Sequence, residues 1–294
     1  MPARVIRVSD DDTRLQAVAS MPVIIVGGGA CGLVAALRLK HHGIEAVVLE
    51  RDSLPRGSTA LSSGFIPACA TRVQQKASID DSPDLLARDI QNKAHDTADP
   101  KLVLAYTQAI GPAIDWLGAA HALPFELIDG FLYPGHSVLR MHAVPERTGE
   151  GLMNRLQIAA EQAGIDILCH AHVTELLADH DSRIGGVTLS RPDGSHETVA
   201  CEHLLLACNG FGGNAELVAK WLPEMVGAAF GGIHGVENDE AAILDPAVRI
   251  LEPLHEPVFK HGLMRRLAQI HAARARQELS PADIVVEKES QSQQ

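Results

Sequence analysis

The sequence lacks the features that would point to nucleic acid, to a membrane or to a disulfide-stabilised fold. Its 25 Lys and Arg are outnumbered by 37 Asp and Glu, which gives a net charge of −12, and the basic residues form no concentrated stripe. An acidic chain of this kind is repelled by the phosphates of nucleic acids and of anionic membrane surfaces. We therefore expect a small-molecule partner, with no nucleic acid and no membrane.

Cysteines are few and are not grouped in pairs. The chain has five, and none of them follows the C-x-x-C spacing, so the sequence predicts neither a disulfide framework nor a metal site. No apolar run approaches the roughly 20 residues of a membrane-spanning helix. Asp10, Asp11 and Asp12 stand where a signal peptide would need an apolar stretch. We expect a cytoplasmic protein with a loose N-terminal extension over residues 1–20 and no metal.

The strongest pattern is VIIVGGGACGLVAALRLKHHGIEAVVLERD at residues 23–52. Its first four residues are apolar and β-branched, which predicts a strand buried on both faces. Gly27, Gly29 and Gly32 follow with G-x-G-x-x-G spacing. The first glycine permits a tight turn, the second lets the backbone approach a pyrophosphate, and the third lets a helix pack on the strand.

The residues after these glycines complete a βαβ pattern. A helix should run to Gly43, and Ile44–Leu49 should form a second parallel strand. Glu50 ends that strand at the distance from Gly32 where an acid accepts hydrogen bonds from an adenosine ribose, which also argues against NADP. An ordinary glycine turn in an unrelated α/β protein is the alternative. The ordered set of strand, glycines, helix, strand and acid favours a dinucleotide site.

A small, hydroxyl-rich segment, GSTALSSG, follows at residues 57–64. It offers hydroxyl and N–H donors to a large polar ligand, although surface loops often have the same composition. At this point the chain resembles the FAD-dependent fumarate reductase, succinate dehydrogenase and 3-ketosteroid dehydrogenase family, especially members similar to tricarballylate dehydrogenase. The resemblance runs from about Pro22 to about Gly227. It is carried by GGGACG at 27–32, GSTALSSG at 57–64, residues 79–117, RMHAVPERTGEGLMNRL at 140–156 and LLLACNGFGGN at 204–214.

The resemblance implies FAD as the cofactor and an α/β, Rossmann-like FAD-binding fold over residues 21–227, with a parallel sheet, flanking helices and a small β-meander. It implies that the glycines and residues 57–64 hold the pyrophosphate and the flavin side, that Glu50 holds the ribose, and that the backbone of Val173 lies beside the adenine. The cofactor residues implied in this way are Gly27, Gly29, Ala30, Cys31, Gly32, Glu50, Arg51, Gly57, Ser58, Thr59, Ser63, Gly64, Val173, Ala207, Asn209 and Gly210.

The middle of the chain predicts packing elements. Apolar residues recur at helical spacing over 84–96, 100–117 and 149–163. Strands at Ile184–Leu189 and Glu197–Cys201 should flank a turn at 191–195, and the meander should return to the main sheet at residues 204–206.

Arg140 and His142, together with Arg147-Thr148-Gly149, are the candidates for substrate chemistry, because a cationic pair and an imidazole could clamp a dicarboxylate beside a flavin. The alternative is a structural role, since the chain has 15 His. Ser58 and Ser63 have no neighbouring general base in the sequence, so a serine nucleophile is not predicted.

The last part of the chain leaves two main hypotheses open. The resemblance implies a capping domain with the catalytic groups and a second FAD segment, but from about Gly231 the chain matches neither. The C-terminal segment, residues 228–294, predicts one helix at about 261–279 followed by a polar tail. The chain is then either an FAD-dependent oxidoreductase acting on an activated carbon–carbon bond or a non-catalytic or truncated FAD-binding protein. A second subunit or a homo-oligomer could complete the site. An NAD-binding module is a remote third reading, which residues 57–64 and 207–214 oppose.

Overall fold

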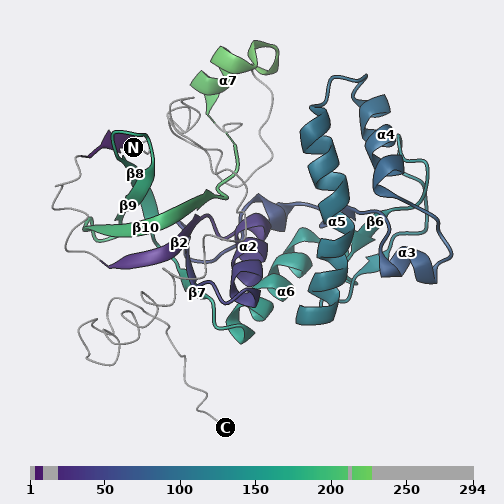
Figure 1. Ribbon diagram of the computed structural model, residues 1–294, viewed down its shortest axis with the longest axis horizontal. Coiled ribbons are helices and arrows are strands. Elements are labelled where there is room, and N and C mark those ends of the chain that lie inside the picture. The colour runs from purple at the N-terminus through teal and green to yellow at the C-terminus, as the bar shows by residue number, and fades with distance from the viewer. Residues whose placement is uncertain (1–3, 9–18, 211–213, 227–294) are drawn as a thin grey trace, which may run out of the picture.

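The computed structural model describes residues 4–8, 19–210 and 214–226. Its centre is a seven-stranded sheet with the order β1-β8-β9-β10-β2-β3-β7 (Figure 1). These strands are β1 (Arg4–Arg7), β2 (Ser20–Val26), β3 (Ala46–Leu49), β7 (Asp166–Leu168), β8 (His172–Ala178), β9 (Ile184–Ser190) and β10 (His196–Leu206).

The part of the sheet built from β10, β2, β3 and β7 is parallel, whereas β8, β9 and β10 form an antiparallel meander. The predicted α/β class, parallel sheet and meander are therefore confirmed. Strand β2 is buried on both faces, as its apolar run predicts. Ile25 packs toward α2 (Ala30–His41), while Ile24 packs with Leu49 and the meander, because successive side chains of a strand point to opposite faces.

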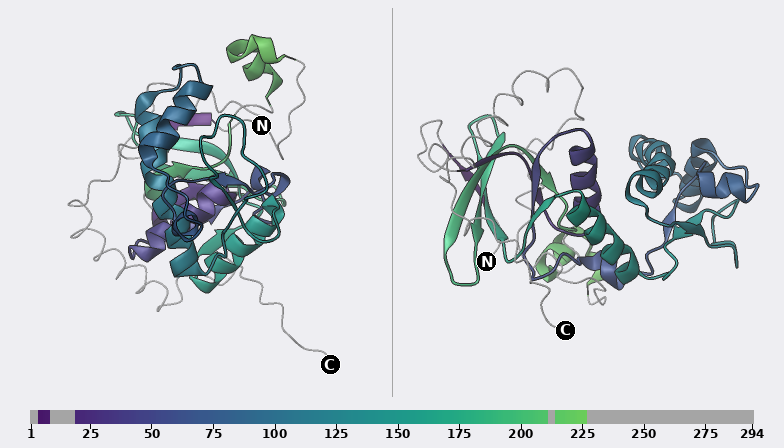
Figure 2. Two further views of the ribbon diagram at one scale, coloured as in Figure 1. Left: turned by 90° about the vertical axis from the view of Figure 1, so that its right-hand side faces the viewer. Right: turned by 90° about the horizontal axis from the view of Figure 1, so that it is seen from below.

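Helices α2 and α6 (Gly149–Gln162) lie between the sheet and a further set of helices, so that the molecule is layered (Figure 2, right). Leu33 and Leu37 of α2 share one core with Leu152 and Leu156 of α6. The remaining elements are β4 (Ile66–Pro67), α3 (Arg72–Lys76), α4 (Pro83–Lys93), α5 (Pro100–His121), β5 (Glu126–Leu127), β6 (Met141–Ala143), α7 (Ala215–Trp221) and the 3₁₀ helices η1 (Ser58–Leu61) and η3 (Pro223–Met225). A small second sheet has the order β4-β6-β5.

Three expectations from the sequence need correction. The N-terminal residues are not uniformly loose, because β1 pairs in parallel with β8. The strands expected at 197–201 and 204–206 are one continuous strand, β10, which pairs with β9 along its first half and with β2 along its second. Helix α5 runs on to His121, where Ala122 ends it in the left-handed conformation (φ 54°).

The helix expected at about 261–279 lies outside the described residues. Within the described part of the chain, no helix is both long enough and apolar enough to cross a membrane.

Candidate cofactor site

The glycine turn, residues 27–32, lies where β2 and its two neighbours in the sheet end. The Gly27 N–H donates to the Leu49 carbonyl (2.8 Å) at the end of β3, and the Ala207 N–H donates to the Val26 carbonyl (2.8 Å) at the end of β10. The carboxyl ends of parallel strands share one edge of the sheet, which is where ligands bind in this class of fold. The structure therefore brings together three segments that the sequence analysis assigned to the cofactor.

Each glycine of the motif occupies a different environment. Gly27 has φ +108°, and a Cβ atom there would lie 2.6 Å from the Ala207 carbonyl oxygen. A Cβ atom at Gly32 would overlap the carbonyl oxygen of Gly27, so α2 begins in direct contact with the turn. A Cβ atom at Gly29 would have no neighbour nearer than 3.9 Å. The tight turn, the open approach and the close packing that the sequence predicts fall on Gly27, Gly29 and Gly32 respectively.

The N-terminus of α2 has the chemistry needed to hold a pyrophosphate. Its N-cap residue, Gly29, provides no side-chain cap, and the Ala30 N–H donates to Thr59 Oγ1 at 3.4 Å. The first N–H groups of a helix, together with its dipole, favour an anion at this end. Cys31 in the first turn is exposed. The residues present therefore fit the diphosphate of a dinucleotide.

Glu50 is buried (8% exposed) directly beside this turn. Its Oε2 accepts from the Gly28 N–H (2.8 Å), and its Oε1 accepts from the Asp52 N–H (3.0 Å). An ionised carboxylate has about four acceptor positions, so two backbone bonds fix its orientation and leave capacity for ribose hydroxyls. Arg51, the next residue, makes a loose ion pair with Asp52 (3.9 Å).

The cofactor loop, residues 57–64, packs against the glycine turn. A Cβ atom at Gly57 would lie 3.1 Å from the Gly29 Cα atom, so the two backbones are close together. Ser63 at the far end of the loop is exposed, whereas Gly64 is buried against Thr148.

Helix α6 supports the cofactor loop from behind, which the sequence analysis did not predict. The Gly149 N–H donates to the Ser62 carbonyl (2.7 Å), and a Cβ atom at Gly149 would overlap the Thr59 carbonyl oxygen. The available signal was Gly149 itself, a glycine at the first position of the helix expected over residues 149–163.

The strand-end segment, residues 207–210, reaches both the turn and the loop. Asn209 has φ +69°, and its Nδ2 donates to Ser58 Oγ at 3.0 Å. Gly210 is exposed and has free space around it. Val173 is the second residue of β8, and the start of this strand lies close to Glu50, because the Ala171 N–H donates to the Glu50 carbonyl at 2.8 Å. Contact of these residues with FAD remains a prediction.

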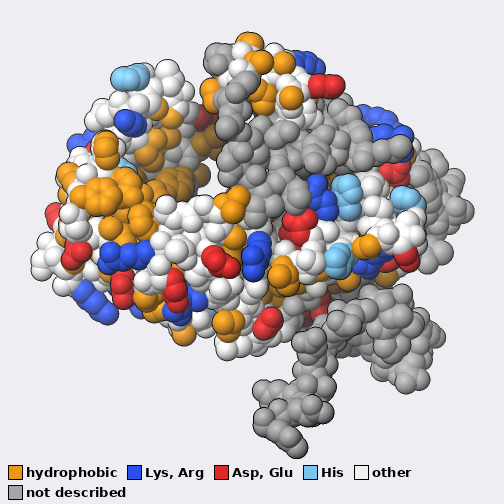
Figure 3. All heavy atoms as spheres, turned by 180° about the vertical axis from the view of Figure 1, so that it is seen from behind, with side chains coloured by type: hydrophobic (Ala, Val, Ile, Leu, Met, Phe, Trp, Pro, Cys, Tyr) orange, Lys and Arg blue, Asp and Glu red, His pale blue; other side chains and the backbone are white. Residues whose placement is uncertain are grey.

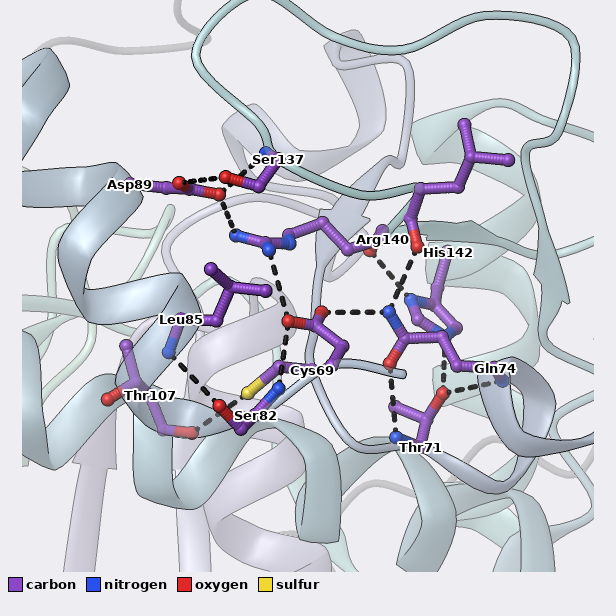
Figure 4. A network of polar contacts seen from close by, with 12 residues as sticks. Cys69, Thr71, Gln74, Ser82, Leu85, Asp89, Thr107, Ser137, Arg140 and His142 are labelled. Carbon is purple, nitrogen blue, oxygen red and sulfur yellow. Dashed lines mark hydrogen bonds and ion pairs between the residues drawn. The ribbon is translucent and has the colours of Figure 1, made fainter. Parts of the chain in front are cut away.

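The two substrate candidates, Arg140 and His142, do not join this site. They lie in a polar cluster among α3, α4 and β6 (Figure 4). Arg140 is 1% exposed, and its guanidinium pairs with Asp81 (3.0 Å) and Asp89 (2.8 Å). Because two buried carboxylates already surround this cation, we assign it to the packing of the helices and not to a dicarboxylate clamp.

His142 is fully buried, and both of its ring nitrogens have partners. Its Nδ1 lies 2.9 Å from the Arg140 carbonyl and its Nε2 lies 2.8 Å from Thr71 Oγ1. This arrangement suits a neutral ring that donates from Nδ1 and accepts the Thr71 hydroxyl. Burial lowers the pKa of His142 below its usual value, although hydrogen bonds oppose the shift. We assign the imidazole a structural role.

The fold and the edge of the sheet together define a dinucleotide-binding α/β protein. A model of the FAD binding domain family matches residues 22–249. The chain belongs to this family, and FAD is its cofactor. Among the described residues, no group of His, Cys, Asp and Glu could hold a metal ion.

The relatives include reductases and dehydrogenases. Fumarate reductase (cytochrome) of Shewanella frigidimarina is 28% identical over 251 residues, covering 80% of this chain and 43% of the relative. Urocanate reductase of Eggerthella lenta is 29% identical over 208 residues, covering 69% and 34%. The 3-ketosteroid-Δ4-(5α)-dehydrogenase of Rhodococcus jostii has the same fold, with a TM-score of 0.69 at 23% identity over 83% of this chain and 56% of that one. The chain thus spans less than half the length of these two curated relatives.

Because the glycines occupy different environments, substitution of Gly29 should impair FAD binding, whereas substitution of Gly32 should impair stability. Gly29→Val should fold like the wild type and fail to retain FAD, because its side chain fills the open approach. Gly32→Val should cost about 3 kcal/mol of unfolding free energy, because its Cβ atom overlaps backbone. Flavin content and denaturant unfolding measure the two effects. A Gly29→Val protein that retains FAD would place the pyrophosphate elsewhere.

Arg140, Asp81 and Asp89 form a buried ion cluster, so removal of one of these charges should lower the free energy of unfolding strongly. Asp89→Ala should cost about 3–5 kcal/mol in denaturant unfolding, because it leaves the buried Arg140 with half of its compensation. The control is Glu146→Ala, which removes an exposed ion pair with Arg155 and should change stability little. Equal losses for the two variants would contradict this interpretation.

The same cluster predicts the sign of a pH effect. Burial raises the pKa of Asp89, but hydrogen bonds from Ser137 and the charge of Arg140 outweigh it and hold this pKa below its usual value. A lowered folded-state pKa stabilises the protein above the unfolded-state pKa, and this stabilisation is lost as the pH falls through the folded-state value. Asp89→Ala should therefore lose less stability on acidification than the wild type, as followed by unfolding at a series of acidic pH values.

Proposed function

We propose that this chain is the FAD-holding part of an oxidoreductase that transfers hydride between flavin N5 and an activated carbon–carbon bond of a small carboxylate or keto substrate. The observation that carries the proposal is the meeting of the glycine turn, Glu50 and the cofactor loop at one edge of the sheet, in a chain of the FAD binding domain family. Bound FAD supplies the two-electron chemistry, and the protein supplies binding and orientation.

The chain's own residues are proposed to bind the cofactor by its polar half. The N-terminal amides of α2 would hold the pyrophosphate, and the carboxylate of Glu50 would accept the ribose hydroxyls. Ser58 and Thr59 are placed across the same opening by the packing of Gly57 on Gly29. This arrangement corresponds to a Rossmann-like nucleotide site.

The substrate class is proposed from the relatives. Those named fumarate reductase and urocanate reductase are named for unsaturated carboxylates, and the dehydrogenase similar in fold is named for a ketosteroid. Hydride addition to carbon is easiest where a carbonyl or carboxylate group activates the double bond. Since Arg140 is neutralised, we propose that the cations facing such a substrate are other residues of this chain, such as the exposed Arg147, or belong to another polypeptide.

The second candidate is a non-catalytic or truncated FAD-binding protein. The chain corresponds to only 43% of the fumarate reductase that it matches, and its proposed role ends with cofactor binding in this reading. The observation that favours it is the same neutralised Arg140, because neither substrate candidate of the described region reaches the cofactor edge.

We also propose that the chain assembles with a second subunit or with copies of itself. The proposed compartment is the cytoplasm. Hydrophobic side chains gather on the back of the molecule, at the end formed by α3, α4 and α5 (Figure 3). Large apolar residues that are open to solvent include Phe131 (53% exposed) and Trp221 (57% exposed). Large apolar surfaces of soluble domains commonly mark contacts with another protein.

The first test is the visible absorption spectrum of the purified full chain. We expect a flavin spectrum, release of FAD on denaturation, and bleaching by an anaerobic reductant. Reoxidation of the reduced flavin by fumarate, urocanate or a 3-keto-Δ4-steroid would support the oxidoreductase. Retained and reducible FAD that none of these substrates reoxidises, alone or with a co-expressed partner, would favour the non-catalytic reading. A chain unable to bind added FAD would overturn both.

Cys31 provides a footprint of the cofactor. This exposed thiol lies in the first turn of α2, whereas Cys69 and Cys201 are buried. We expect N-ethylmaleimide to modify Cys31 several-fold more slowly once FAD is bound, as followed by peptide mass spectrometry. Cys31→Ser should remove the FAD-sensitive label from this peptide, which the mass spectra separate from the peptide of the half-buried Cys208 in the strand-end segment. Equal rates with and without saturating FAD would show that the cofactor does not cover the turn.

A further inference from the structure

The glycine turn, the cofactor loop and the strand-end segment meet at the N-terminus of α2. Each of these three segments contacts the other two. The glycine turn touches the cofactor loop through Gly29 and Gly57, and it touches the strand-end segment through Gly27 and Ala207. Both contacts are made by backbone atoms. The third contact joins the cofactor loop to the strand-end segment and is a hydrogen bond between the side chains of Ser58 and Asn209 (3.0 Å).

The geometry of Asn209 is set by the backbone and not by burial. Its φ of +69° lies in the left-handed region, which asparagine tolerates better than most residues with a side chain. The residue is exposed, so packing does not hold its side chain in place. The hydrogen bond to Ser58 is thus the described interaction that fixes the amide over the cofactor loop.

The cofactor loop has little regular structure of its own. It contains one 3₁₀ turn, η1, in which the Ala60 N–H donates to Gly57 at 3.4 Å and the Ser62 N–H donates to Thr59 at 3.0 Å. Helix α6 supports the end of the loop through the Gly149 N–H, which donates to Ser62. The beginning of the loop, at Ser58, is the part that Asn209 reaches.

We propose that Asn209 is a positioning residue for FAD, which acts by holding Ser58 and the start of the cofactor loop in the geometry that receives the pyrophosphate. The proposal rests on FAD as the cofactor. A loop that is already ordered loses less conformational freedom on binding, so a single contact of this kind raises affinity without touching the ligand. Asn209 then contributes through Ser58, in addition to any contact of its own backbone.

The decisive variant is Asn209→Gly, because glycine keeps the positive φ without strain and removes only the amide. We expect it to weaken FAD binding to the apoprotein about 3- to 10-fold, the effect of one exposed hydrogen bond. Asp96→Gly is the matched control, because Asp96 is also exposed with positive φ (58°) but lies at the end of α4. This control should bind FAD like the wild type.

Hydrogen exchange of the apoprotein tests the same contact without cofactor or activity. The amides of Ala60 and Ser62 should exchange faster in Asn209→Gly than in the wild type. Their exchange rates should be the same in Asp96→Gly as in the wild type. Asn209→Asp separates the ordering of the cofactor loop from the effect of a negative charge on FAD binding. Its carboxylate can accept the Ser58 hydroxyl, so it should retain the slow exchange, yet it should bind FAD more weakly than the wild type because it faces a pyrophosphate.

The outcomes distinguish this proposal from the cofactor assignment. Faster loop exchange together with weaker FAD binding in Asn209→Gly supports the positioning role. Unchanged exchange, or FAD binding equal to or tighter than wild type, overturns it. If the wild type itself binds no FAD, the proposed function fails. The exchange experiment then still decides whether Asn209 orders the cofactor loop. A loop that is ordered by Asn209 in a protein that binds no FAD would overturn the proposal that Asn209 positions this loop for FAD.

Discussion

The structure depends on the contact between Gly32 and the carbonyl of Gly27. No side chain fits between them, so α2 starts directly against the glycine turn at the end of β2. This fixes where the helix dipole and the first amides of α2 point. Glu50, the cofactor loop and the strand-end segment lie around that point and each makes a short contact with the glycine turn.

A second polar constraint operates in the helical part of the molecule. Arg140 just before β6 pairs with Asp81 before α4 and with Asp89 within it, so one guanidinium connects elements far apart in the sequence. Desolvation of three charges makes such a cluster a poor source of net stability compared with apolar packing of the same volume. Its value lies in geometry, because one guanidinium can lie between the carboxylates of Asp81 and Asp89 only when α4 and β6 hold a particular arrangement.

The sequence predicts the cofactor edge well because its determinants are local. The strand, the glycines, the helix and Glu50 fall within 30 consecutive residues, and each has a spacing with a physical meaning. Predictions failed where the deciding partner is distant. Nothing near Arg140 in the sequence reveals that Asp81 and Asp89 neutralise it, nothing near residues 4–7 reveals that β8 offers them an edge, and the tight contact of Gly149 with the cofactor loop exists only after α6 has packed on α2.

Binding of a cofactor and recognition of a substrate differ in the same way, in that the first depends on residues close together in the sequence and the second on distant ones. The polar half of a dinucleotide can be held by backbone amides and one carboxylate, and one βαβ unit with a following loop provides these. Recognition of a carboxylate substrate needs cations that are accessible and not already paired, and here the obvious guanidinium is committed to the interior by two acids. The two tasks therefore use different residues: the groups that fit the nucleotide lie in one local stretch of the chain, whereas the state of Arg140 is decided by acids distant in the sequence.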